Sequence, residues 1–392
     1  MGRFLALGGL IAAVVLAGLS LIDTRSGSGE VTASALLADS GMDSSGFARA
    51  IGPWDWQFPQ DYGPHSDFQT EWWYYTGNLA DATGRRFGFQ FTIFRRAIAP
   101  QPVESASEWR TNQIYMAHFT VTDVTGEQFY HQERFSRDSA GLAGAEIDPS
   151  YHVWLENWQV QGLNADDTRT RISASTDDVA LDVTMQQVKR PALQGESGLS
   201  PKGPEPGNAS YYYSLTRLLT EGTVTIGGET YTVTGNTWKD HEFSTSALGS
   251  DAVGWDWFGL IFDDGREMTI GRIRLADGGE RAYSGGAGSE ALLIEQDGSE
   301  RYIPADTFHL EALDTWTSPH TGGEYPSGWR VTFDDPDTGE TVNFTLTPLL
   351  KDQELHGSGI VYWEGAVRIE GDVRGYGYAE LTGYIDALTG RF

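Results

Sequence analysis

The segment Gly235-Asn-Thr-Trp-Lys-Asp-His-Glu-Phe243 concentrates acidic, basic and aromatic side chains over a few consecutive positions. Alternate residues of an extended strand point to the same side. The strand then has two faces, with Trp238, Asp240 and Glu242 on one and Lys239 and His241 on the other. Aromatic surroundings disfavour the charge of a carboxylate and raise its pKa, so Asp240 or Glu242 is a candidate general acid near neutral pH. The alternative is a solvated edge strand or a structural network of Asp, His and Lys side chains.

A second aromatic segment, His65-Ser-Asp-Phe-Gln-Thr-Glu-Trp-Trp-Tyr-Tyr-Thr-Gly77, contains a carboxylate. Alternation places Glu71, Trp73 and Tyr75 on one face, and Trp72 and Tyr74 on the other. A strand that is aromatic on both faces lies between a core and something else, either a partner domain or a ligand cavity. Glu71 needs an Arg or Lys partner among these rings. The alternative is a central core strand of the first domain.

Two later segments are also rich in aromatic residues. In Trp255-Asp-Trp257 the two tryptophans share a face, and we expect them to contribute to an aromatic wall. Near the C-terminus, Tyr362-Trp-Glu-Gly365 is followed by alternating Gly and Tyr from Gly375 to Tyr384, which predicts a closing hairpin with a curved strand. Packing is the expected role of this hairpin.

Several common kinds of site have no sequence signature here. The chain lacks HExxH, a phosphate-binding glycine loop, a dinucleotide fingerprint and the Gly-x-Ser-x-Gly elbow. It has no Cys, which excludes disulfides and thiolate chemistry. No two of the eight His have the spacing of metal ligands on one face, so a metal site would require assembly of distant residues. We predict no metal and no cofactor.

The elements that must position these side chains are short β-strands. Stretches rich in Thr, Val, Phe and Tyr alternate with dense turn signals. The turns are Asp81-Ala-Thr-Gly84, Val124-Thr-Gly126, Ile226-Gly-Gly228, Asp263-Asp-Gly265, Ala276-Asp-Gly278 and Asp335-Pro-Asp-Thr-Gly339. Strands joined in this way are typical of sandwiches and barrels, so we predict an all-β, antiparallel protein.

A weak internal repeat refines this prediction. Trp73-Tyr-Tyr-Thr-Gly77 and the residues up to Arg95 recur, in order and spacing, as Trp255-Asp-Trp-Phe-Gly259 and the residues up to Arg274. A chain of 392 residues is also long for one core. We therefore predict two related β domains, at 46–234 and 235–392. The Pro/Gly-rich stretch 191–207 marks their boundary or, alternatively, covers the mouth of the first domain.

The first 45 residues predict targeting. Arg3 precedes an uncharged apolar run over residues 4–22, and an acidic, Gly/Ser-rich linker follows. The run fits an uncleaved membrane anchor, which we favour, or a cleaved signal peptide with its site at Ala33-Ser-Ala35. Either predicts a periplasmic or secreted protein that contacts the membrane only through this segment. The net charge of −28 argues against binding to nucleic acid or anionic lipid.

A set of ordered motifs resembles the AttH-like secreted proteins, which are labelled predicted secreted hydrolases and are related to carotenoid 1,2-hydratase, also called hydroxyneurosporene synthase. The resemblance covers nearly everything from Ile51 onward. The motifs are Asp61-x-Gly63-x-His65, Glu71-Trp-Trp-Tyr74, Gly77-Asn-Leu79, Gly207-Asn-Ala-Ser-Tyr-Tyr-Tyr-Ser214, Trp238-Lys-Asp-His-Glu242, Gly254-Trp-Asp-Trp257, Tyr325-Pro-x-Gly-Trp329 and Tyr362-Trp-Glu-Gly365.

This resemblance implies two lipocalin-like β-barrels in tandem, with an apolar ligand cavity near their contact. In the hydratase branch, an Asp in a Tyr-x-Asp-His setting protonates an isolated alkene, and water captures the cation. The matching positions here are Trp238, Asp240 and His241. The chain departs from the branch at Trp238, because an indole cannot ionise or relay a proton as a phenol does.

The leading hypothesis is an exported protein that binds a hydrophobic, isoprenoid-like molecule and hydrates an alkene. Asp240 would be the acid and His241 would orient it or position water. The expected ligand-binding residues are Glu71, Trp73, Tyr75, Trp238, Glu242, Trp255 and Trp257. The rival is a non-catalytic lipid carrier or accessory protein of an envelope ABC transporter. A third reading, a secreted hydrolase, has no nucleophile or metal motif in its support.

Overall fold

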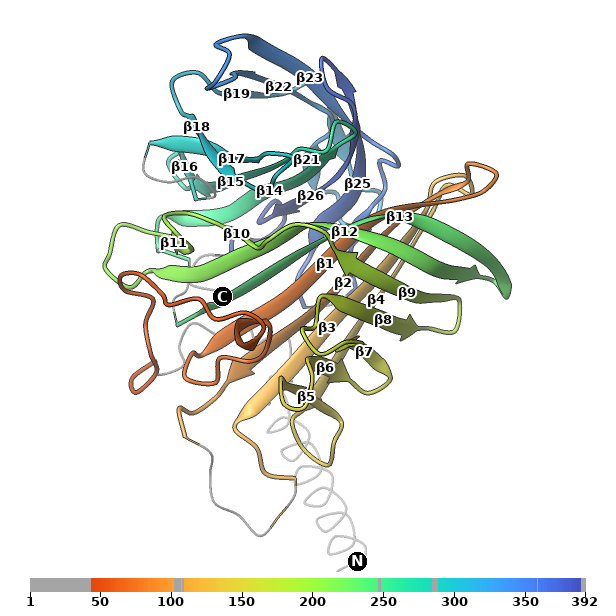
Figure 1. The fold of residues 1–392 in the computed structure, drawn as a ribbon, viewed down its shortest axis with the longest axis vertical. Helices are drawn as coiled ribbons and strands as arrows, with labels where there is room; N and C mark the ends of the chain where they lie inside the picture. The colour runs from red at the N-terminus through yellow and green to blue at the C-terminus, as the bar shows by residue number, and fades with distance from the viewer. Residues whose placement is uncertain are drawn as a thin grey trace, which may run out of the picture.

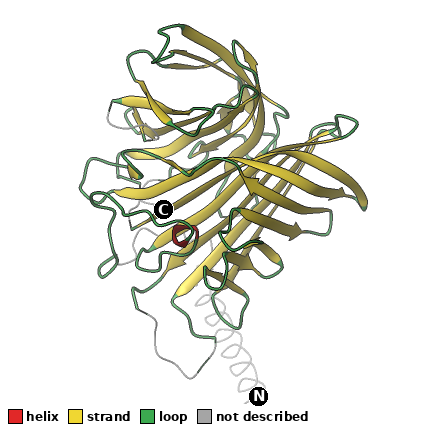
Figure 2. Ribbon diagram, viewed as in Figure 1, coloured by secondary structure: helices red, strands yellow, loops and turns green. Residues whose placement is uncertain are grey.

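The computed structural model describes residues 44–101, 107, 109–245, 248–283, 288–357 and 359–388. Within these ranges the protein is all-β, as predicted, with one short 3-10 helix, η1 (Gln60–Tyr62) (Figure 2). The described residues include no helix long and apolar enough to span a membrane. The predicted targeting run, residues 4–22, and nearly all of the linker after it lie outside the described residues.

The first sheet has 13 antiparallel strands, in the order β4-β3-β2-β1-β13-β12-β9-β8-β7-β6-β5, with β10 and β11 paired to β12 (Figure 1). Their bounds are β1 Thr70–Asp81, β2 Arg86–Ala97, β3 Gln113–Asp123, β4 Gln128–Arg137, β5 Ala143–Glu146, β6 His152–Leu155, β7 Trp158–Gly162, β8 Arg169–Ser175, β9 Val179–Gln187, β10 Ala192–Leu193, β11 Leu199–Pro201, β12 Ala209–Ile226 and β13 Glu229–Ser244.

The second sheet has 11 antiparallel strands, in the order β18-β17-β15-β14-β26-β25-β23-β22-β19, with β16 paired to β15 and β24 to β25. A separate pair is formed by β20 (Thr315–Thr317) and β21 (Glu324–Pro326). The bounds of the others are β14 Ala252–Phe262, β15 Glu267–Leu275, β16 Glu280–Ala282, β17 Ser289–Ile294, β18 Glu300–Pro304, β19 His309–Ala312, β22 Trp329–Asp334, β23 Thr341–Pro348, β24 Glu354–Leu355, β25 Tyr362–Gly371 and β26 Gly375–Thr382.

The two sheets repeat one topology. In each, the first strand pairs with the last, β1 with β13 and β14 with β26. The repeated sequence segments form the corresponding hairpins β1–β2 and β14–β15. The Gly/Tyr-rich segment forms the hairpin β25–β26, as predicted. Each sheet curls around its own apolar core, giving the tandem of lipocalin-like barrels that we expected.

A third apolar cluster fills the contact between the barrels. It combines Tyr74, Tyr212 and Trp238 of the first sheet with Trp257 and Tyr362 of the second. In Figure 1 the strands β12 and β13 run along this contact, below the teal and blue strands of the second barrel. The first barrel therefore has apolar side chains on both faces of its central strands.

The change from one sheet to the next lies between Ser244 and Ala252, later than the predicted boundary at residue 235. The reason is that β13 pairs with β1 and β12 along its length and so closes the first sheet. The stretch 191–207 lies within the first sheet. It also reaches the second barrel, where Gln194 donates a hydrogen bond to the Thr269 hydroxyl at 2.9 Å.

Candidate functional site between the barrels

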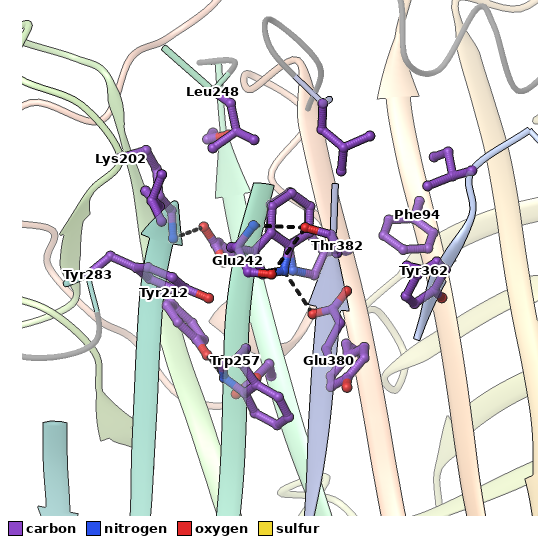
Figure 3. A pocket seen from close by; sticks show the side chains of 18 of the residues that line it. Phe94, Lys202, Tyr212, Glu242, Leu248, Trp257, Tyr283, Tyr362, Glu380 and Thr382 are labelled. Carbon is purple, nitrogen blue, oxygen red and sulfur yellow. Dashed lines mark hydrogen bonds and ion pairs between the residues drawn. The ribbon is translucent and has the colours of Figure 1, made fainter. Parts of the chain in front are cut away.

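A cavity lies between the two barrels, with about 950 Å³ of space free of protein atoms, counted out to its open mouth. Most of its wall is apolar and aromatic, and both barrels contribute (Figure 3). The lining residues are Trp72, Tyr74, Phe94, His118, Lys202, Tyr212, Asp240, Glu242, Ser244, Leu248, Trp255, Trp257, Ile273, Tyr283, Ile360, Tyr362, Glu380, Thr382 and Leu388. We call it the interdomain cavity.

Strand register builds one wall of this cavity. On β13, Asp240 lies between Tyr74 of β1 and Ser214 of β12. Two residues along, Glu242 lies in the same way between Trp72 and Tyr212. Side chains directly opposite each other on adjacent strands share a face, so both rows point toward the second barrel. Each of the two acids therefore has an aromatic ring or a hydroxyl group on either side of it.

Asp240 is a buried acid held by neutral donors. Its Oδ1 atom accepts hydrogen bonds from the Ser214 hydroxyl at 2.5 Å and from Trp238 Nε1 at 2.8 Å. Burial raises the pKa of Asp240 to about 7, although these hydrogen bonds oppose the shift. A substantial fraction of Asp240 therefore carries a proton at neutral pH, as a general acid must.

The second barrel supplies another acid to the cavity. Glu380 accepts a hydrogen bond from Trp255 Nε1 at 3.0 Å, and burial raises its pKa to about 7. Glu242 has a different environment, because Lys202 Nζ lies 2.7 Å from its carboxylate. In Figure 3, Glu242 lies against Lys202, and Glu380 stands apart from them. Asp240 and Glu380 are thus the candidate proton donors of this cavity.

A chain of hydrogen bonds leads from the cavity toward the outside of the first barrel. The Tyr362 hydroxyl lies 2.6 Å from His118 Nδ1, and His118 Nε2 lies 2.9 Å from Glu133. With the Nε2 proton donated to Glu133, His118 Nδ1 accepts the proton of the Tyr362 hydroxyl. The Tyr362 oxygen accepts one hydrogen bond from Gln90 Nε2, at 3.4 Å. Its second lone pair is available to a water molecule in the cavity, which Tyr362 lines.

The other face of β13 points into the first barrel. His241 Nε2 lies 2.8 Å from Glu71 Oε1, and its ring stacks on that of Trp73. Arg95 Nε also donates to Glu71, at 2.9 Å, which confirms the predicted basic partner. Burial raises the pKa of Glu71, but Arg95 and the imidazoles of His241 and His65 outweigh it, so the pKa lies below its ordinary value. Burial lowers the pKa of His241 to about 4, which leaves this ring neutral.

Three of these groups could form a metal-ligating set. Within the described part of the chain, ligand atoms of His65, Glu71 and His241 all lie within 4.8 Å of one another. Two imidazoles and a carboxylate suit Zn²⁺. In this structure the Glu71 carboxylate already accepts hydrogen bonds from Arg95 and from the backbone N–H of His65, so it is neutralised and satisfied by the protein itself.

The structure separates the predicted site residues into two groups. Asp240, Glu242, Trp255 and Trp257 line the interdomain cavity, and Trp238 supports Asp240 from behind. Glu71, Trp73, Tyr75 and His241 lie instead inside the first barrel. The cause is the alternation of β1 and β13, because the residues of β1 that share a face with Asp240 are Trp72 and Tyr74. His241 faces Glu71 and away from Asp240.

Sequence reasoning missed several residues of the cavity. Tyr212 and Tyr362 line the cavity, and Ser214 holds Asp240 from the neighbouring strand. The sequence motifs that contain them predict no binding role, and only strand register places these residues near the acids. His118, Lys202 and Glu380 had no local signal. They come from β3, the stretch 191–207 and β26, which meet only in the folded chain.

Comparisons with known proteins agree with this architecture. A search of curated proteins gave no match. An AttH crystal structure from Nitrosomonas europaea is 34% identical, with a TM-score of 0.74, over 86% of this chain and 100% of that one. Two more distant structures share the fold: kievitone hydratase from Nectria haematococca (17% identity, TM-score 0.61, covering 84% and 93%) and CghA in complex with Sch210972 (12%, 0.53, covering 88% and 98%). Since the AttH-like family model also matches residues 49–384, this chain belongs to the AttH-like family.

Proposed function

We propose that the interdomain cavity binds a hydrophobic molecule with an isolated alkene, and that Asp240 catalyses the addition of water to it. The observation that carries the proposal is a buried carboxylic acid with a pKa of about 7 in a wall of aromatic rings. Few side chains other than a raised-pKa carboxyl can donate a proton strongly enough to an alkene at neutral pH. The name of one structural relative, kievitone hydratase, agrees with water addition.

In this mechanism the Asp240 proton bonds to one alkene carbon and leaves a carbocation at the other. Trp72, Trp255 and Trp257 line the cavity, where the quadrupole of an indole ring stabilises positive charge. Water then bonds to the cation and releases one proton, which restores Asp240. The Tyr362 oxygen, oriented through His118, is placed to accept a hydrogen bond from the attacking water.

The test is hydration of a panel of isoprenoid alkenes, from geraniol to squalene, measured as a mass increase of one water. We expect Asp240→Asn to lower turnover at least a hundredfold, because general acid catalysis contributes roughly 10²–10⁴-fold. Turnover should also fall as pH rises through about 7, where Asp240 loses its proton. Asp182→Asn, on an exposed ion pair, is the control and should leave turnover unchanged. If Glu380→Gln abolished turnover and Asp240→Asn did not, the general acid would be Glu380.

The second candidate function is a non-catalytic lipid carrier, favoured by the apolar lining and open mouth of the same cavity. A carrier needs the cavity but no proton donor. Quenching of tryptophan fluorescence on titration with each alkene separates the two functions. Binding without hydration across the panel, equal in the wild type and Asp240→Asn, would favour the carrier.

A further inference from the structure

A second cavity lies at the other end of the contact between the barrels, and we call it the polar cavity. Its lining residues are Asn78, Ala80, Arg86, Arg217, Thr234, Gly235, Asn236, Ile261, Phe262, Asp263 and Tyr376. About 210 Å³ of it can hold the centre of a water molecule, whereas one buried water needs roughly 10–15 Å³. The polar cavity therefore has room for a molecule of several non-hydrogen atoms.

The polar cavity is separate from the interdomain cavity, although both use the same strands. On β1 the lining changes from Tyr74 to Asn78, which are about 13 Å apart along the strand. The residues between the two cavities are Thr76 on β1, Trp238 on β13 and Tyr378 on β26, and all three are buried. The two cavities have no lining residue in common, so each can bind a ligand of its own.

Arg86 offers an unoccupied set of donors to the polar cavity. Its guanidinium lies 3.7 Å from the centre of the Tyr376 ring, which covers one side of the group. Within the described part of the chain, no hydrogen bond or ion pair occupies the N–H groups of this half-buried side chain. The preceding residue differs, because Arg85 pairs with Asp123 at 2.5 Å. A guanidinium held against a ring, with its N–H groups unoccupied, suits a carboxylate bound by two parallel hydrogen bonds.

The charges around the polar cavity also favour an anion. Arg217 Nε and Lys189 Nζ both lie against the Glu267 carboxylate, at 2.5 and 2.7 Å, so one negative charge is shared by two cations. Arg86 adds a third cation, and Asp263 is the one acidic residue of the lining. The lining residues and their ion-pair partners are therefore positive overall, in a chain whose net charge is −28.

Two more polar groups of the lining have no partner among the residues that the structure describes. The Asn236 side chain forms no hydrogen bond, and its Oδ1 atom is buried. Asp263 is exposed, and its carboxylate forms no ion pair with Arg86, although both side chains line the cavity. A ligand with an anionic group for Arg86 and a hydrogen-bond donor for Asp263 would satisfy both, and the Asn236 amide can turn to donate or to accept.

We propose that the polar cavity binds a small carboxylate that also carries a hydroxyl or ammonium group, as hydroxy acids and amino acids do. The carboxylate lies against the Arg86 guanidinium, and the hydroxyl or ammonium group donates to Asp263. This site is independent of the alkene chemistry, because it contains none of the residues that line the interdomain cavity.

The test is isothermal titration calorimetry of the full chain, at constant ionic strength, with four probes. Malate and aspartate add a hydroxyl or an ammonium group to the succinate skeleton, and inorganic phosphate is an anion without a carboxylate. We expect saturable binding of malate, of aspartate or of both, and binding of succinate at least tenfold weaker than that of the tighter of the two, because the partner of Asp263 is missing. Equal binding of all four probes, binding of phosphate alone, or no binding would overturn the proposal.

Variants then locate the site. Arg86→Gln should weaken binding at least tenfold, because hydrogen bonds to a charged group are lost. Asp263→Asn separates the two ligand classes, since it should weaken aspartate, whose ammonium needs a negative charge, more than malate. Arg330→Gln, on an exposed ion pair far along the second barrel, is the control and should bind as the wild type does.

Unchanged affinity in Arg86→Gln would overturn the proposal. Circular dichroism shows whether each variant is folded. The comparison of malate and aspartate with succinate uses only the wild type, so it decides the question even if a substitution at position 86 impairs folding.

Discussion

At the scale of single residues, the surroundings of a side chain decide what its carboxylate or amine can do. Asp240 and Glu242 lie two positions apart on one face of β13, yet Glu242 binds Lys202 and Asp240 accepts only neutral donors. The sequence alternation correctly paired these acids on one face. It could not tell which of them has a cation beside it, because Lys202 comes from a distant part of the chain.

Asp240→Asn should change the pH dependence of stability. The unfolded carboxyl loses its proton near pH 4 and the folded one near pH 7, so the folded state holds an extra proton between these values. Asp240 therefore stabilises the fold fully below about pH 4, and that contribution is lost as pH rises through 7. In urea unfolding, we expect Asp240→Asn to gain on the order of a few kcal/mol relative to wild type between pH 4.5 and 8. A difference in unfolding free energy between the two proteins that does not change with pH would contradict the raised pKa.

Arg95 is predicted to be essential for the stability of the first barrel. It is 1% exposed and neutralises Glu71, which is fully buried. Removing one partner of a buried pair costs about 3–5 kcal/mol, so Arg95→Met should lower the free energy of unfolding by that amount. Arg330→Met is the matched control, since the Arg330–Glu311 pair is exposed and should contribute at most about 1 kcal/mol. Equal effects of the two substitutions would refute the assignment.

At the scale of elements, the hairpins were the most predictable feature. All six turn signals join neighbouring strands, because Gly and Asp at a turn act locally. Register was not predictable. Which residues of β1 lie beside Asp240 depends on pairing across about 170 residues, and the choice between Trp72 with Tyr74 and Glu71 with Trp73 follows from that pairing alone.

Close packing between β13 and β14 depends on Gly259. A Cβ atom there would lie 2.5 Å from the Trp257 ring and 3.1 Å from that of Trp238. Gly259→Ala should therefore displace these indoles, lower stability by about 1–3 kcal/mol and weaken ligand binding in the interdomain cavity. Gly279→Ala is the control, because Gly279 lies in an exposed turn where an added Cβ atom would come no closer than 3.0 Å to a neighbour, an Asp277 carboxylate oxygen. Urea unfolding and fluorescence titration measure both effects; unchanged binding in Gly259→Ala would contradict this packing argument.

At the scale of the whole molecule, the two barrels depend on each other. The Tyr74 hydroxyl donates to Glu364 of the second barrel at 2.6 Å, and Asn78 donates to the backbone of Gly377 at 2.9 Å. A shared apolar cluster fills the space between these contacts. The repeat and the resemblance predicted two barrels. The position of the boundary could not be predicted, because the motif at 235–243 lies within β13, which is the last strand of the first barrel.

We expect the barrels to unfold in one cooperative transition. If one barrel unfolded, the other would expose the shared apolar cluster and lose the hydrogen bonds across the contact. Neither barrel should therefore stay folded without the other. Thermal unfolding followed by tryptophan fluorescence and by circular dichroism should give coincident curves. Two separated transitions, or a protease-resistant fragment ending near Ser244, would show that the barrels are independent.

Strand β13 has one further consequence for how this protein can change. Successive residues of β13 point alternately into the interdomain cavity and into the first barrel. The number of residues in the strand before Asp240 can therefore change only by an even number if each side chain is to keep its side. Inserting or deleting one residue upstream of Trp238 would turn Lys239 toward the interdomain cavity and Asp240 toward the inside of the first barrel, while an even number would restore both. During evolution this strand should therefore accept substitutions more readily than single-residue insertions, because one insertion moves the side chains of both faces to the wrong side.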